Sequence, residues 1–234
     1  MRIKKYILFT LFGICISCSN KTDRSTIFGL EGNVKTYTEL YYQAAHKFGE
    51  WQQGKLSEEF GNMKVSFERT GNYESLEFLD ADHNLTEKMI PVREKGEIIE
   101  ELRYNPEGEL MGKMELTFRS DTKIKFKNLD VKDGITSKGI SFIENDRIIR
   151  QEIILLDSYT PSDKRPKIFL DFEYDSKGRI ISQKQTDQDG NVDYQYTFKH
   201  VEFDEHNNWT KRLDYDEKDT ENPKKVVTRV YEYY

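Results

Sequence analysis

Cysteine is almost absent from this chain of 234 residues: there are two, Cys15 and Cys18. A domain stapled by disulfides, or one built round a cysteine-rich metal site, is therefore excluded. Long hydrophobic runs are also missing, because the N-terminal run over 6–16 has only eleven residues, whereas a transmembrane helix needs about 20. Positive charge is not in excess, since 36 Lys and Arg face 42 Asp and Glu. Phosphate contacts need clustered Lys and Arg, so this balance argues against a nucleic-acid binder.

The start of the chain has the layout of an export signal. Three basic residues stand among the first five, and the apolar run over 6–16 follows them. A positive start before a short apolar region is typical of a secretory signal peptide. We expect residues 1–17 to be this signal peptide. Its removal subtracts three positive charges, so residues 18–234 carry 33 positive and 42 negative charges, a net of −9.

Cys18 follows the small residue Ser17 at the end of this run. The pair resembles the lipobox of bacterial lipoproteins, whereas Cys15 fits that pattern poorly because Ile14 precedes it. The resemblance implies that the Cys18 thiol takes a diacylglyceryl group and becomes the N-terminus, anchoring an outer-membrane lipoprotein on the periplasmic face or the cell surface. We expect residues 18–26, which are polar, to be a flexible lipidated tether. The alternative is an ordinary signal peptide in which both cysteines are incidental.

Residues 27–234 contain a repeated unit that predicts tight turns. The unit has an aromatic or aliphatic residue, then polar residues, with Gly or Asn near the fifth position. An early Asp or Asn can hydrogen-bond its own backbone, and Gly or Asn supplies a positive φ. The clear copies start at Tyr104, Tyr174 and Phe203, and looser ones cover 67–71, 79–85 and 186–192.

The residues between these turns alternate as β-strands do. In 167–174 one face carries Ile168, Leu170, Phe172 and Tyr174, and 192–198 alternates in the same way. Near the C-terminus one face carries Val227, Tyr231 and Tyr233, and the other carries Val226, Thr228 and Val230. We predict an all-β domain over 27–234, an antiparallel meander of β-hairpin repeats forming a long twisted or curled sheet. A surface loop over 158–166 gives possible sub-sheets 27–157 and 167–234. Residues 41–48 can form a helical turn or two.

The unit over 174–179, with Asp189-Gly190 after it, resembles the YD repeat of RHS-type proteins. The ending over 203–212 and 227–233, and the opening over 30–35, are similar to small YD-repeat lipoproteins of Gram-negative bacteria. The resemblance covers about 30–110 loosely and 168–234 well, and residues 112–166 depart from it. It implies interaction with a ligand or surface, including carbohydrate, rather than catalysis.

Aromatic residues are the candidate binding residues. They can form a stacking platform for sugars or peptides, or they can fill the core and brace neighbouring strands. The candidates are Trp209, Tyr194, Tyr196, Tyr231 and Tyr233.

No pattern predicts a metal or a catalytic nucleophile. Asp187-x-Asp189 starts like a calcium loop, but Phe198 stands at the twelfth position, where that loop needs Glu. We therefore expect a non-enzymatic, lipid-anchored envelope protein that binds a glycan or protein ligand, with no cofactor, metal or nucleic acid. The alternatives are an immunity protein that neutralises a toxin, and an envelope glycan hydrolase that uses an unidentified carboxylate pair.

Overall fold

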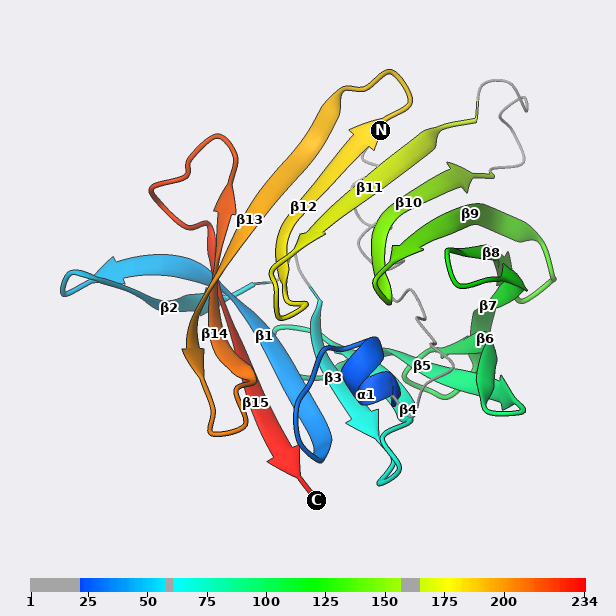
Figure 1. The fold of residues 1–234 in the computed structure, drawn as a ribbon, viewed down its shortest axis with the longest axis horizontal. Coiled ribbons are helices and arrows are strands. Elements are labelled where there is room, and N and C mark those ends of the chain that lie inside the picture. The colour runs from blue at the N-terminus through cyan, green and yellow to red at the C-terminus, as the bar shows by residue number, and fades with distance from the viewer. Residues whose placement is uncertain (1–21, 58–60, 157–164) are drawn as a thin grey trace.

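The computed structural model describes residues 22–57, 61–156 and 165–234. These residues form one short helix and fifteen β-strands (Figure 1). Within the described part of the chain, no helix is long and apolar enough to cross a membrane. The elements are α1 (Asp23–Thr26), β1 (Val34–Lys47), β2 (Glu50–Leu56), β3 (Asn62–Phe67), β4 (Tyr73–Leu79), β5 (Leu85–Glu94), β6 (Glu97–Tyr104), β7 (Leu110–Arg119), β8 (Lys123–Asp130), β9 (Ile135–Glu144), β10 (Arg147–Leu155), β11 (Lys167–Tyr174), β12 (Ile180–Asp187), β13 (Val192–Phe203), β14 (Trp209–Asp216) and β15 (Lys225–Tyr233).

The strands form one antiparallel sheet whose two ends meet. Neighbours in the sequence are neighbours in the sheet from β3 to β15, and β1 pairs with both β3 and β15. Tyr37 in β1, for example, lies opposite Val65 on one side and Tyr231 on the other. The all-β antiparallel meander is therefore confirmed, and fourteen strands (β1 and β3–β15) close into a barrel. In Figure 1 the last strand runs beside β1, while β2 extends from the barrel as a hairpin with β1.

The helical turns predicted over 41–48 are wrong. β1 continues through Lys47, and His46 pairs with Trp51 across the β1–β2 hairpin. The hairpin turns at Phe48 and Gly49, both with positive φ, which is the backbone that a two-residue hairpin loop requires. On the far side of the predicted loop, β10 pairs directly with β11. The regions 27–157 and 167–234 therefore contribute strands to one sheet, and residues 157–164 lie outside the described residues.

The repeated unit forms one kind of turn. The turn starts at the second residue of the unit. The first residue of the turn accepts a backbone hydrogen bond from the fourth, which has a positive φ, and donates one to the fifth. This is a type I turn followed by a bulge. In the turn 175–179 the carboxylate of Asp175 also accepts bonds from the backbone of Lys177 and Arg179, both at 2.9 Å. The seven turns of this kind cover 68–72, 80–84, 105–109, 130–134, 175–179, 187–191 and 204–208.

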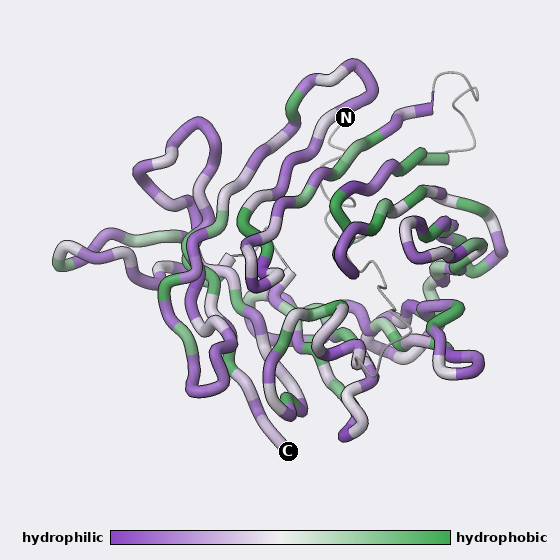
Figure 2. The backbone as a smooth tube through the Cα atoms, in the orientation of Figure 1, coloured by the Kyte–Doolittle hydropathy of each residue, from purple (hydrophilic) through white to green (hydrophobic). Residues whose placement is uncertain are grey.

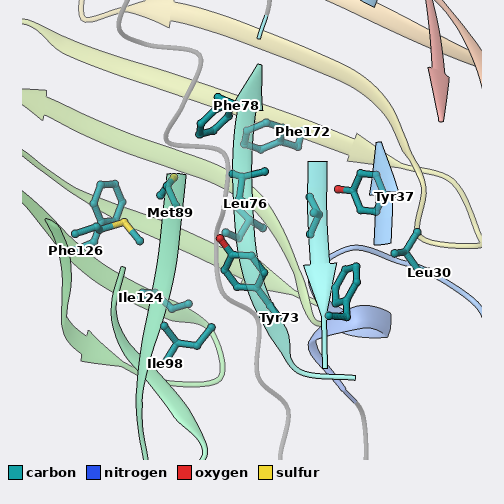
Figure 3. Close-up of a cluster of buried hydrophobic side chains, with 14 of the residues drawn as sticks. Leu30, Tyr37, Tyr73, Leu76, Phe78, Met89, Ile98, Ile124, Phe126 and Phe172 are labelled. Carbon is teal, nitrogen blue, oxygen red and sulfur yellow. The ribbon is translucent and has the colours of Figure 1, made fainter. Parts of the chain in front are cut away.

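Alternation places apolar residues inside the barrel, where one hydrophobic cluster joins facing strands. Figure 3 shows Leu76 and Phe78 of β4 in this cluster, together with Phe172 of β11. Figure 2 shows that hydrophobic residues occur as short stretches along strands, whereas most connecting loops are hydrophilic. Burial of this cluster is the main stabilising term that the fold offers.

Charged pairs cover the outer face of the barrel. Glu77 lies between the buried Leu76 and Phe78, so it points outward, and Lys88 pairs with it at 2.9 Å. Lys113 lies 2.6 Å from Glu115, whose other oxygen is 2.6 Å from Lys127. On these strands the outer side chains are therefore charged, whereas inner ones such as Leu76 and Phe78 are apolar.

Residues 22–33, which we call the closing segment, lie across one end of the barrel (Figure 1). Arg24 donates to the carbonyl of Glu68 at 2.9 Å, and Asp23 pairs with Arg93 of β5. On the opposite side of the rim, Arg147 of β10 donates to the carbonyl of Thr26 at 2.7 Å. The segment thus contacts the ends of several strands around the barrel.

Two further contacts hold the closing segment in place. The Asn208 side chain accepts from the backbone N–H of Glu31 at 2.8 Å and donates to its carbonyl at 2.9 Å. The ring of Phe28 packs against Phe67 and Tyr73, with centroids 5.0 and 5.5 Å away. Residues 22–26 of the expected tether therefore belong to the folded barrel, and residues 18–21 lie outside the described residues. The sequence did not predict this because residues 22–26 are held by polar contacts rather than by an apolar face.

Candidate functional site

A cavity of about 260 Å³ lies within the barrel, lined mainly by β11–β15, β1 and the closing segment. It extends from residues 26–30 to Gly61 and Lys225. Lys225 begins β15, and the other end of β15 meets the closing segment, where Tyr234 donates to the carbonyl of Asn33 at 3.0 Å. The cavity therefore runs from the closed end of the barrel toward the opposite end.

Two ion pairs are built into the cavity wall. Arg212 of β14 binds Asp214 through two bonds, with Nε–Oδ1 at 2.6 Å and Nη2–Oδ2 at 3.0 Å. Arg229 of β15 donates its Nε to Oε2 of Glu39 in β1 at 2.6 Å. The other oxygen of Glu39 accepts the hydroxyl of Tyr41. Charges buried in this way must be paired and hydrogen-bonded to be tolerated.

Aromatic rings hold the cations of this wall. The Arg229 guanidinium lies 4.1 Å from the ring centre of Trp209 and 4.5 Å from that of Tyr37. Arg212 lies 5.0 Å from Trp209 and 4.5 Å from Phe198. Each guanidinium is thus restrained by two rings as well as by a carboxylate.

The titratable groups respond to this concentration of positive charge. Burial alone would raise the pKa of Glu39, but Arg229 and Arg212 lower it below its usual value. Beside Trp209, burial lowers the pKa of His200 to about 4, and Arg212 and the neighbouring arginines add to the effect. His200 is therefore neutral at pH 7, and Glu39 is ionised.

The structure divides the five predicted aromatic residues into two groups. Trp209, Tyr194 and Tyr196 line the cavity. Tyr231 and Tyr233 do not line it; like Tyr194 they pack against the hydrophobic core, and the Tyr231 hydroxyl donates to the carbonyl of Trp209 at 2.8 Å. The predicted lipidation residue, Cys18, lies outside the described residues.

Sequence reasoning missed the charged members of this wall, although a signal was present. Lys225 and Arg229 stand at the same alternating positions as Val227 and Tyr231, which face inward. Glu39 stands likewise between Tyr37 and Tyr41. A charged residue at an inward-facing position of a strand is unusual unless it is paired, so these positions could have been singled out.

Another buried acid lies in the core and is not part of the cavity lining. Glu101 of β6 is 1 % exposed, and neither of its carboxylate oxygens has a hydrogen-bond partner among the described residues. Burial raises the pKa of Glu101 to about 8, and the nearby Arg93 only partly opposes this. Arg93 is already paired with Asp23. Glu100, its neighbour in the sequence, points outward and pairs with Lys113 at 3.3 Å, so the two acids cannot act together.

Over residues 22–57, 61–156 and 165–234, no group of three His, Cys, Asp or Glu side chains is placed to hold a metal ion. Asp187 is instead the first residue of a hairpin turn, and its carboxylate accepts from the backbone of Asp189 and Asn191, both at 2.9 Å. The calcium-like spacing is thus used for turn formation.

No family model matches the chain, and no curated protein sequence matches it. Among solved structures, a porin-like protein from Bacteroides uniformis is similar over 86 % of this chain and 98 % of its own, at 6 % identity and a TM-score of 0.43. A chain of the TcdB2-TccC3-Cdc42 complex is similar over 75 % of this chain and 10 % of its own, at 8 % identity and a TM-score of 0.31. Likenesses this weak carry no argument about function.

Proposed function

We propose that this chain is a lipid-anchored protein of the cell envelope that binds a small ligand in its barrel cavity without transforming it. The observation that carries the proposal is the cavity itself. Inward-facing strand positions that would otherwise complete the core hold a wall of arginines restrained by Trp209, Tyr37 and Phe198. Binding sites are typically concave and mostly apolar, with a few fixed polar groups. At about 260 Å³ the cavity is smaller than the roughly 300–1,000 Å³ of typical ligand pockets, which favours a ligand smaller than a typical drug.

The charged outer wall supports attachment to the membrane through a lipid on Cys18. Barrels that cross membranes have an apolar band on the outer face, whereas the outer face of this barrel carries charged pairs. Cys18 precedes Thr22 by four residues, which span at most about 14 Å when extended. An anchor at Cys18 would therefore place the closing segment next to the membrane. The Gly61 and Lys225 end of the cavity would face away from it.

The anchor is tested by replacing Cys18 with Ala in the full chain. The wild type should incorporate labelled palmitate and fractionate with membranes, whereas the Cys18→Ala variant should do neither. If that variant still carries the label and remains with the membranes, Cys18 is not the anchor.

Ligand binding is tested by a glycan-array screen of the Cys18→Ala protein, with two matched Ile→Trp variants. Ile180 lines the cavity, so Ile180→Trp should fill it and abolish any binding found. Ile149 is 36 % exposed and does not line the cavity, so Ile149→Trp should leave binding unchanged. Equal effects of the two variants would show that the ligand binds elsewhere.

A further inference from the structure

The wall of the cavity carries more positive than negative charge, although residues 18–234 as a whole are acidic. Five cations line it, while its acids among the described residues are Asp214 in the lining and the partners Glu39 and Asp175. This local surplus distinguishes the cavity from the outer face, where acids and bases alternate. The cations are Arg147, Arg179, Arg212, Lys225 and Arg229.

Arg212 retains hydrogen-bonding capacity toward the cavity. A guanidinium has five N–H donors, and among the described residues the carboxylate of Asp214 takes only those on Nε and Nη2. Among the described residues no hydrogen bond uses the Nη1 group of Arg212, and Arg212 lines the cavity. Arg229 likewise uses Nε for Glu39 and lines the same cavity.

Trp209 packs against both guanidinium groups. Their central carbons lie 5.0 and 4.1 Å from its ring centre. A preorganised pair of guanidinium groups recognises carboxylate and phosphate better than flexible lysines do. The rings of Tyr194 and Tyr196, which also line the cavity, offer apolar surface for the rest of a ligand. His200 has a pKa of about 4, so its charge does not change near pH 7 and should not alter ligand binding there.

We infer that the ligand of this cavity is a small organic anion, a carboxylate or phosphate on a ring-shaped body, held through its acidic group by Arg212 and Arg229 beside Trp209. This inference rests on the proposed ligand-binding function and specifies the chemical class of the ligand.

The test uses Trp209 as the reporter, in the full chain with Cys18→Ala. The chain has two tryptophans, and Trp51→Phe on the protruding hairpin leaves the one at the site. Its fluorescence is titrated with two matched pairs of probes, glucuronate against glucose and benzoate against benzamide. Within at least one pair the anion should bind about tenfold or more tightly than its neutral partner. Added salt should weaken binding of the anion alone.

Two double variants locate the charge that is responsible. Arg212→Met with Asp214→Leu removes the buried pair without changing the net charge, an exchange that proteins often tolerate, and should abolish the preference for the anion. Arg150→Met with Asp171→Leu is the matched control, because this outer-face pair (3.2 Å) also has its arginine over a ring, 4.8 Å from Phe169. The control should keep the preference.

The outcomes separate the two proposals. Equal binding of the anion and its neutral partner refutes the anion inference and leaves the ligand-binding function standing. A preference that survives the Arg212–Asp214 variant also refutes it. If none of the four probes changes the fluorescence of the folded protein, both the anion inference and binding in this cavity are contradicted. If the Arg212–Asp214 variant does not fold, the affinities of the anionic and neutral probes for the protein with an unchanged cavity wall decide whether the anion inference holds.

Discussion

Glu101 should make the barrel less stable as the pH rises. Its ordinary pKa is 4.5, and burial raises it to about 8 in the folded protein. Between these values the unfolded chain has lost the proton while the folded chain keeps it. Stability therefore falls by about 1.4 kcal/mol for each pH unit in this window, and the loss sums to roughly 5 kcal/mol at most. The stability that the protonated side chain provides is fully present below pH 4.5.

The perturbation that tests this is Glu101→Gln, because an amide has nearly the same shape and cannot ionise. We expect the variant to resemble the wild type near pH 5 and to be more stable by several kcal/mol near pH 9. Urea unfolding followed by circular dichroism between pH 5 and 9 measures the difference. Glu100→Gln is the control, since Glu100 is partly exposed and pairs with Lys113. If the free energies of unfolding of the wild type and Glu101→Gln change with pH in parallel, the pKa of Glu101 is not raised by folding.

Two other predictions concern the closing segment. Asn208→Ala removes the two bonds to Glu31 and one to the Tyr233 hydroxyl (2.8 Å), so it should cost about 2–3 kcal/mol and speed amide exchange in residues 22–33. Asn191→Ala, at the same turn position but exposed, should neither cost as much stability nor speed this exchange. Equal exchange in the two variants would show that Asn208 does not hold the closing segment. Gly178→Ala should destabilise the barrel by about 1 kcal/mol more than Gly190→Ala, because Arg147 must move and lose its bond to the Thr26 carbonyl. Both need a positive φ, but only at Gly178 would the added carbon lie 2.5 Å from Arg147; similar unfolding midpoints would count against the contact.

Local structure was predictable because it depends on neighbouring residues. Asp175 and Gly178 specify a turn through their own backbone bonds, and the alternation from Ile168 to Tyr174 specifies a strand with one buried face. The turn over 130–134 was missed, since Asp133 rather than a glycine holds its positive φ. Asp tolerates this conformation, and the glycine of this turn, Gly134, stands one position later than expected.

Closure of the barrel was not predictable, because it joins residues far apart in the chain. Thr38 lies opposite Val230, and neither residue carries a local signal for that pairing. Whether the predicted curled sheet closes into a barrel depends on the sum of the register offsets of all its hairpins. The closing segment depends on the same long-range contacts.

The candidate site was predictable only in part, for the same reason. Trp209, Tyr194 and Tyr196 were identified as aromatic residues, but their shared cavity follows from the arrangement of β12–β15. Alternation alone places Arg229 on an inward face. That it meets Glu39 requires β1 and β15 to be neighbours, which only closure provides.

The most direct test of a closed barrel with an anion-binding interior is anomalous diffraction from crystals of the Cys18→Ala protein soaked in sodium bromide. We expect β1 to be hydrogen-bonded to β15 and a bromide peak to lie inside the barrel, within contact distance of Arg212 and Arg229. An open sheet, or bromide bound only on the outer face, would contradict it.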